Sequence, residues 1–334
     1  MTTPTAAKAL DGIHHVTAIA KDPQVNVDFY TGVLGLRLVK RTVNQDDPGT
    51  YHLFYGDALG HPGTELTFFA WPRGRRGSAG AGQWVAVALA IPPTAVSYWL
   101  DRLRALGVDH HAPAQRLDED VIALSDPEGM PVELVAGPDT GEREPWRPWA
   151  LGPVPPQFQI RGVHAVTTMA ASPDETAAFL ADRMGFRLLK DDRRRLRFGT
   201  GPGQSGALLD VVLAPARSRG SVAVGSIHHV AWRTPDADTQ QRWFAALNAS
   251  GVPTSPVIDR FWFHSIYFNE PGGALFEIAT DGPGFTVDED AGALGSRLVL
   301  APWLEPQRAT IERALPAIHL PTERDTDTEG RPMG

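Results

Sequence analysis

The feature that most constrains the fold is a unit that occurs four times along the 334-residue chain. Each unit opens with a short apolar strand, continues through a helix that a glycine ends, and closes on a further strand. In three units the opening residue and the glycine are 23 positions apart, as in Gly12 and Gly35, Trp84 and Gly107, and Gly162 and Gly185; Ser226 and Gly251, in the fourth, are 25 apart. Such alternation of strands and helices predicts an α+β fold.

Local signals place the helices inside these units. Asp22-Pro23 opens the first helix, and Pro92-Pro93-Thr94 opens the second, whose apolar residues recur at helical spacing up to Leu106. Ser172-Pro173-Asp174-Glu175 predicts a capping box at the third, with proline at the first helical position. Thr234-Pro235 predicts the start of the fourth helix.

The chain divides between the second and third units. Residues 141–158 are rich in proline, glycine and tryptophan, which is typical of a linker. We therefore expect a pair of units in residues 1–140 and another pair, with a tail, in residues 159–334. The polar end, residues 321–334, has the composition of a disordered segment.

Composition excludes several classes of function. The formal net charge of −8 argues against a nucleic-acid or anionic-membrane partner. No segment approaches the roughly 20 apolar residues of a membrane helix, and the N-terminus lacks the apolar stretch of a secretion signal. The chain has no cysteine, so any metal ligands must be His, Asp or Glu. The sequence predicts a cytoplasmic enzyme, as a monomer or a homo-oligomer.

Two His-His pairs occupy equivalent positions in the opening strands, His14-His15 in the first unit and His228-His229 in the fourth. The first histidine is also present in the third unit, whereas the second is restricted to these two units, which makes His15 and His229 the better ligand candidates. Glu277 is a lone carboxylate in an apolar closing strand, where burial is costly unless a cation or hydrogen bonds compensate it. Two histidines and one carboxylate are the ligands of a facial iron(II) site. The other units offer weaker counterparts: Val87 and Ala165 for the second histidine, and Thr67, Glu133 and Asp210 for Glu277.

The ligand set depends on which units pair. If the first packs with the fourth, one cavity receives His15, His229 and Glu277, with the neutral Thr67 opposite. If neighbours along the chain pair instead, His229, Glu277 and Asp210 share one cavity, and His15 and Glu133 share the other. Sequence spacing does not choose between these arrangements.

Several motifs resemble one known family. The repeated unit is similar to the βαβββ module of the vicinal oxygen chelate superfamily, which includes glyoxalase I, bleomycin-resistance proteins and extradiol dioxygenases. More narrowly, the chain resembles ring-cleaving dioxygenases that act on hydroquinones in these segments: residues 38–47, 51–57, 63–64, 226–229 and 302–308. The resemblance implies four βαβββ modules paired into two domains with mixed, curved sheets, the first module with the fourth.

The resemblance also implies the site. It assigns iron(II), or manganese(II) as a competing metal, to His15, His229 and Glu277, and it places Tyr267 and Arg260 near the substrate. His14 and His228 match histidines beside the ligands.

The implied activity is Fe(II)-dependent cleavage of a hydroquinone-type or catechol-type aromatic diol by O2, with His228 or Tyr267 relaying protons. The alternative is a glyoxalase-like lyase or isomerase. It needs a second metal-bound carboxylate as base, and Thr67 stands at that position. A third alternative is a metal-free binding protein, which the two His-His pairs disfavour.

Overall fold

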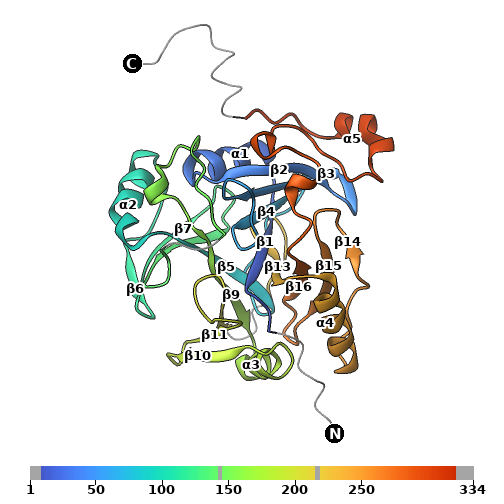
Figure 1. Ribbon diagram of the computed structural model, residues 1–334. Coiled ribbons are helices and arrows are strands. Elements are labelled where there is room, and N and C mark those ends of the chain that lie inside the picture. Colours follow the sequence, from blue (N-terminus) through green and yellow to red (C-terminus); the bar gives the residue numbers. More distant parts are fainter. Residues whose placement is uncertain (1–8, 142–144, 215–218, 321–334) are drawn as a thin grey trace.

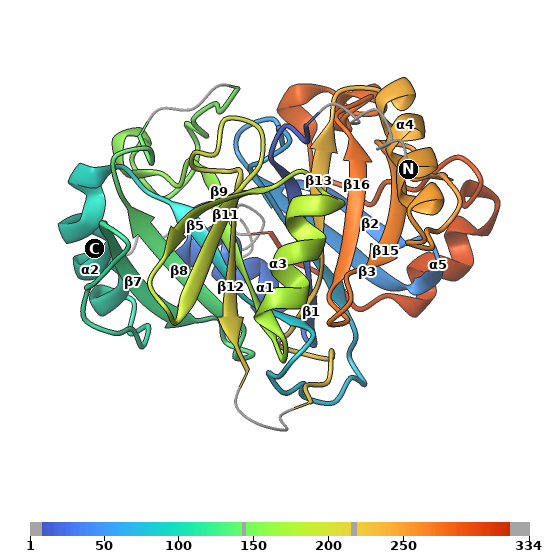
Figure 2. The same ribbon diagram turned by 90° about the horizontal axis from the view of Figure 1, so that it is seen from below.

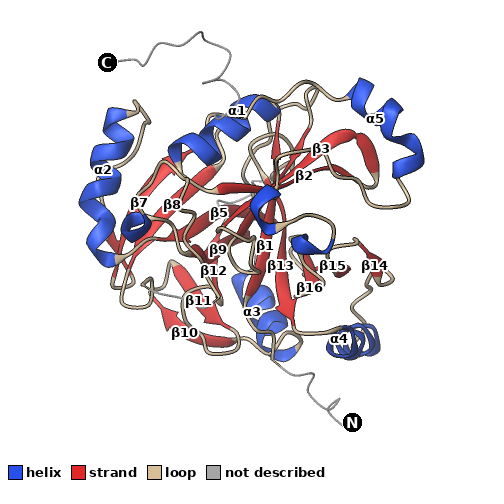
Figure 3. Ribbon diagram, turned by 45° about the horizontal axis from the view of Figure 1, so that its top comes forward, coloured by secondary structure: helices blue, strands red, loops and turns tan. Residues whose placement is uncertain are grey.

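Two eight-stranded sheets form the framework of the computed structural model, which describes residues 9–141, 145–214 and 219–320. Figure 1 shows the sheets side by side, and Figure 3 shows the helices arranged around the strands. One apolar core extends over both sheets and includes Trp99, Trp232 and Phe276. No helix in the described ranges is long and apolar enough to cross a membrane.

Each predicted unit is a βαβββ module. The first module contains β1 (Ile13–Ala20), α1 (Pro23–Val27) continued by a π-helical segment (Asp28–Val33), β2 (Arg37–Asn44), β3 (Asp47–Gly56) and β4 (Glu65–Ala70). The second contains β5 (Gln83–Ala90), a 3₁₀ turn (Pro93–Ala95), α2 (Val96–Ala105), β6 (Ala114–Arg116), β7 (Glu119–Ser125) and β8 (Pro131–Ala136).

The second half of the chain repeats this order. The third module contains β9 (Gly162–Ala170), α3 (Pro173–Asp182), β10 (Arg187–Asp191), β11 (Arg195–Gly199) and β12 (Leu208–Leu213). The fourth contains β13 (Ile227–Thr234), α4 (Ala237–Ala249), β14 (Ile258–Asp259), β15 (His264–Asn269) and β16 (Leu275–Thr280). After it come 3₁₀ turns at Phe285–Val287, Ala291–Ala293 and Glu305–Gln307, and α5 (Arg308–Ala314). The tail beyond residue 320, predicted to be disordered, lies outside the described residues.

The first module pairs with the fourth. One sheet has the order β14-β15-β16-β13-β1-β4-β3-β2, and the other has the order β10-β11-β12-β9-β5-β8-β7-β6. Antiparallel contacts of β1 with β13 and of β5 with β9 join the modules at the centre of each sheet (Figure 2). The pairing implied by the resemblance is therefore confirmed, and pairing of sequence neighbours is excluded. Each sheet draws strands from both sides of residues 141–158.

The helix-ending glycines behave as expected. Gly35, Gly107, Gly185 and Gly251 have φ angles of +70°, +66°, +69° and +83°, a conformation that side-chain-bearing residues rarely adopt.

Two helix starts differ from the predictions. Ser172 is the N-cap of α3 but its side chain makes no capping hydrogen bond, so the predicted capping box is wrong, although Pro173 does begin the helix. The fourth helix begins at Ala237 rather than at Thr234-Pro235, because the Asp236 carboxylate caps it by accepting from the backbone N–H of Thr239.

One counterpart was assigned to the wrong face. Ala88 pairs with Glu133 in the way that Thr17 pairs with Thr67, so the residue equivalent to His15 is Ala86. Val87 instead joins the apolar core. The second unit has one more residue between its opening strand and the helix-ending glycine: Ala88 lies 19 positions before Gly107, whereas Thr17 lies 18 positions before Gly35. Counting back from the glycine therefore misplaces the strand by one residue, which assigns each side chain to the opposite face.

Candidate metal centre and substrate pocket

The strand register explains how distant residues reach one site. Two rows of paired residues cross the first sheet with approximate two-fold symmetry. One row runs over β1, β13, β16 and β15 through His15, Ala231, Glu277 and Tyr267. The other runs over β13, β1, β4 and β3 through His229, Thr17, Thr67 and Phe54. Because paired residues project from the same face, both ligand histidines and Glu277 face one concavity.

Three candidate ligand atoms converge at the centre of these rows. His15 Nε2 lies 3.4 Å from His229 Nε2 and 3.3 Å from Glu277 Oε2, and His229 Nε2 lies 3.0 Å from the same oxygen. Ligand atoms about 2.1 Å from one ion, at angles of about 90–109°, are roughly 3.0–3.4 Å apart. The triad spacing therefore fits a single metal ion.

Glu277 is placed and charged as a ligand for a cation would be. Its side chain has no exposure; Oε1 accepts a hydrogen bond from Ser265, but none of the described residues is a partner of Oε2 in hydrogen-bonding geometry. Burial is the largest single influence on the pKa of Glu277 and acts to raise it, but His15 and His229 together hold it well below its usual value. An ionised, buried oxygen without a donor is costly unless a metal neutralises it.

A chain of hydrogen bonds sets the tautomer of His15. The Thr280 carbonyl can only accept, so His14 Nε2, 3.2 Å away, donates to it. Burial, reinforced by His15, keeps the pKa of His14 well below its usual value, so His14 is neutral and its Nδ1 accepts. His15 Nδ1, 3.0 Å from that atom, must then donate, which leaves the lone pair of His15 Nε2 directed at the centre.

The second pair repeats this contact. His228 Nδ1 lies 2.8 Å from His229 Nδ1. Burial, followed by the influence of His229, lowers the pKa of His228 to about 3, so its ring is neutral. Hydrogen bonds of this kind to the far nitrogen of a ligand imidazole fix its orientation and its tautomer. His14 and His228 therefore contact the ligand histidines, and the pocket lining includes neither of them.

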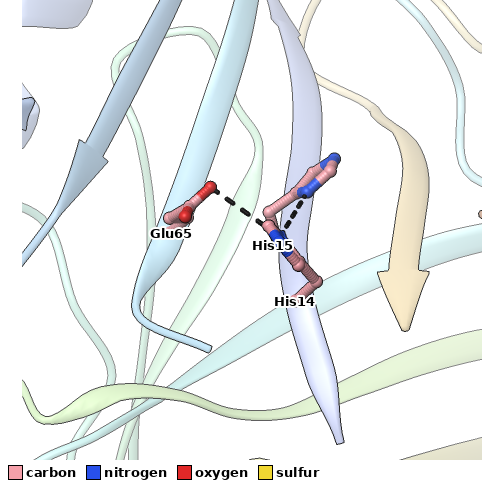
Figure 4. Close-up of side chains that lie close together, drawn as sticks. All are labelled: His14, His15 and Glu65. Atoms are coloured by element: carbon pink, nitrogen blue, oxygen red, sulfur yellow. Dashed lines mark hydrogen bonds and ion pairs between the residues drawn. The ribbon is translucent and has the colours of Figure 1, made fainter. Parts of the chain in front are cut away.

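A second group of metal-binding residue types shares His15 with the first. Glu65 approaches from β4 and places Oε2 3.9 Å from His14 Nδ1 (Figure 4). In this group the two Nδ1 atoms already bond to each other, and burial, followed by repulsion from Asp57, raises the pKa of Glu65 well above its usual value. The group centred on Glu277 is the better match to a metal because its three ligand atoms are free to face an ion.

A pocket adjoins the triad and contains the predicted substrate residues. Tyr267 and Arg260 line it, with the Arg260 guanidinium 5.6 Å from the Tyr267 ring centre. Burial, followed by the Glu277 charge, raises the pKa of Tyr267, so its phenol stays protonated. Burial acts to lower the pKa of Arg260, but the hydrogen bond and charge of Asp46 help to hold it above its usual value. A larger hollow, beside α1 and residues 314–317, contains none of these residues.

Sequence reasoning missed other residues of this pocket. His52, Phe54 and Phe69 form one wall, and His52 Nε2 lies 2.9 Å from Thr67 Oγ1. Burial lowers the pKa of His52 well below its usual value, and His15 acts in the same direction. Strand alternation places residues 52 and 54 on one face, and that signal could have identified them.

Among the residues that the structure describes, the other sheet has no such group of metal ligands. Ala86 and Ala165 replace the ligand histidines, and arginines bind the carboxylates: Arg116 forms a bidentate pair with Glu133 at 2.7 and 2.6 Å, and Arg197 binds both Asp210 and Glu119. Ion pairs therefore occupy the face that corresponds to the triad.

Comparisons with known proteins agree with this geometry. Residues 12–134 and 162–278 match the Glyoxalase/Bleomycin resistance protein/Dioxygenase superfamily. The chain belongs to that superfamily.

Several known proteins are similar over most of the chain. Bacillus subtilis MhqO, provisionally named a ring-cleaving dioxygenase, is 41% identical over 92% of this chain and 97% of its own. Chlorohydroquinone/hydroquinone 1,2-dioxygenase from Sphingobium indicum is 33% identical over 89% of this chain and 93% of its own. A crystal structure of a protein provisionally described as a dioxygenase, from Bacillus subtilis, has a TM-score of 0.88 and 40% identity, covering 94% of this chain and 99% of the other. Maize glyoxalase I shares the fold, with a TM-score of 0.58, 15% identity and coverage of 81% and 92%. These similarities support a dioxygenase function.

Proposed function

We propose that this superfamily member is an Fe(II)-dependent ring-cleaving dioxygenase that acts on a hydroquinone-type or catechol-type aromatic diol. The observation that carries the proposal is the facial triad of His15, His229 and Glu277 beside a pocket with an aromatic wall. Three protein ligands on one face leave positions open for substrate and O2. The names of the relatives point to the same reaction.

Neighbouring residues orient the proposed ligands. Iron(II) at this site would supply a redox-active centre with open coordination positions. His14 and His228 hold the ligand imidazoles in the tautomer that presents Nε2. Ser265 holds Glu277 by its other oxygen, which fixes the direction of Oε2.

Two residues act on the substrate in this proposal. Tyr267 keeps its proton, so it can donate a hydrogen bond to negative charge that develops on the substrate or on oxygen. Arg260 stays cationic at the pocket and favours an anionic diol or ring-opened acid. Its partner Asp46, 2.9 Å away, is largely exposed.

The lyase or isomerase alternative is weaker. It requires a carboxylate on β4 where Thr67 stands, at the position symmetrical with Glu277. The Thr67 hydroxyl is already hydrogen-bonded to Thr17, at 2.8 Å, and to His52. A threonine held in this way cannot serve as the base.

Oxygen uptake tests the proposal. Protein loaded anaerobically with iron(II) is mixed with hydroquinone, methylhydroquinone or catechol, and a parallel sample carries manganese(II). We expect uptake with the para-diols and none in metal-stripped protein. His229→Ala should lose both bound iron and uptake; full iron content in this variant would refute the ligand assignment. Iron binding without uptake with any diol would favour the lyase or isomerase.

A further inference from the structure

His52 occupies a distinctive position in the pocket. It extends from β3 into the pocket, and its ring lies 4.0 Å from that of Phe54 and 4.4 Å from that of Phe69, measured between centres. The Phe69 ring in turn lies 6.4 Å from the ring of His229. The wall formed by His52, Phe54 and Phe69 therefore reaches from the pocket lining to the metal ligands.

The two nitrogens of His52 have different surroundings. Nε2 bonds to Thr67 Oγ1 at 2.9 Å, and Thr67 bonds to Thr17 at 2.8 Å, so the ring orientation is fixed. Nδ1 makes no hydrogen bond with any residue in the ranges 9–141, 145–214 and 219–320. It is also not one of the unpartnered side-chain atoms that are fully buried. It therefore faces open space, and the space beside His52 is the pocket.

The symmetry of the sheet shows that His52 differs in its contacts from the residue at the equivalent position of the fourth module. His52 pairs with Phe69 as Ser265 pairs with Ala279, so His52 is the counterpart of Ser265. Ser265 supports the ligand Glu277, but the counterpart of Glu277 is Thr67, which is no ligand in the proposed site. His52 is therefore not needed to hold a metal ligand.

The same symmetry locates His52 relative to the metal. β3, which carries His52, is two strands away from β1, and β15, which carries Tyr267, is two strands away from β13 on the opposite side. Each residue is therefore about 10 Å across the sheet from the strand of a ligand histidine. A ring bound at the triad lies between these walls. Tyr267 and Arg260 supply polar groups on one side, and among the three residues of the opposite wall only His52 carries one.

On the basis of the proposed function, we propose that His52 is a specificity-determining residue: its Nδ1 hydrogen-bonds the second oxygen of the diol, remote from the metal, while its ring packs on the substrate with Phe54 and Phe69. A neutral imidazole offers one donor and one acceptor nitrogen. Because the Thr17 and Thr67 hydroxyls can each donate or accept, the network allows either tautomer of His52. His52 can thus meet a hydroxyl or an ionised oxygen.

Equilibrium binding to two ligands tests this role. The iron(II)-loaded protein is titrated anaerobically with hydroquinone and with phenol, which lacks the second oxygen, and quenching of tryptophan fluorescence is followed because Trp262 lines the pocket. His52→Phe keeps an aromatic wall but removes Nδ1, and should weaken hydroquinone about tenfold with phenol unchanged. His52→Asn returns a polar group near the Nδ1 position but loses the ring, so it should bind both ligands less tightly than the wild type while restoring the preference for hydroquinone over phenol.

The outcomes separate the two proposals. Equal weakening of hydroquinone and phenol in His52→Phe would show a purely structural wall and overturn the role of His52. His111→Phe, at an exposed histidine outside the pocket, is the control and should bind both ligands normally. Wild-type protein that takes up no oxygen with any diol would refute the dioxygenase proposal, whereas the hydroquinone-to-phenol ratio in the variants would still decide the role of His52.

Discussion

Arg197 in the second sheet offers a quantitative test of why only one sheet holds a metal site. It is buried, with 3% exposure, and bonds Asp210 through Nε at 2.8 Å and Nη2 at 2.9 Å, and Glu119 through Nη1 at 2.8 Å. Asp210 is the counterpart of Glu277, because it pairs with Thr167 as Glu277 pairs with Ala231. Arginine thus supplies the positive charge at the position where we propose a metal in the first sheet.

Arg197→Met would remove this charge but keep most of the volume. Loss of one partner of a buried ion pair costs about 3–5 kcal/mol. Arg195 still reaches Asp210 at 2.9 Å and His164 still reaches Glu119 at 2.9 Å, so we expect the lower end, about 3 kcal/mol. At about 2 °C per kcal/mol for a chain of this size, the melting temperature should fall by roughly 6 °C.

The pH dependence gives a second signature. Burial acts to raise the pKa of Glu119, but His164 and Arg197 outweigh it and lower the pKa to about 2, from an ordinary value of 4.5. A lowered pKa contributes stability above pH 4.5 that is lost as the pH falls towards 2. Without Arg197, ionised Glu119 contributes less to the free energy of unfolding. The difference in this free energy between wild type and variant should therefore become smaller as the pH falls from 4.5 towards 2.

Urea unfolding at pH 7, 5 and 3.5 measures the gap. Arg194→Met, at an exposed site in the turn between β10 and β11, is the control and should change stability by less than about 0.5 kcal/mol. A loss below about 1 kcal/mol at pH 7, or a gap that is the same at all three pH values, would refute the reasoning. The iron content should be unaffected, since the triad lies in the other sheet.

Three further predictions concern the proposed site. Ser265→Ala frees Oε1 of Glu277, so iron affinity should fall roughly 10–100-fold in competition with a chelator; unchanged affinity would show that Ser265 does not orient the ligand. Tyr267→Phe should lower kcat for oxygen uptake by about 100-fold or more with normal iron content, and retained turnover would remove the tyrosine from the chemistry. Asp46→Asn releases Arg260 from an exposed partner, so KM for an ionised diol should fall about threefold with little change in stability; an increase in KM would mean that Asp46 itself assists binding.

Much of this architecture follows from the sequence alone. The repeated spacing and the glycines at Gly35, Gly107, Gly185 and Gly251 define four modules, because a left-handed helix end is a local requirement on one residue. The candidate ligands also come from the sequence. Histidines that distinguish two modules from the others, with one carboxylate in an apolar strand, indicated the residues that converge in the structure.

Tertiary structure decided the rest. Strand pairing joins β1 to β13, more than 200 residues away, and the local patterns fit the alternative pairing equally well. Only the register revealed that Ala86, rather than Val87, corresponds to His15, because one additional residue between the strand and its glycine shifts the alignment by one position and so exchanges the two faces of the strand. His52 and Ser265 gain their importance in the same way: each is an ordinary strand residue in sequence, and a neighbouring strand supplies the Thr67 or Glu277 that it contacts.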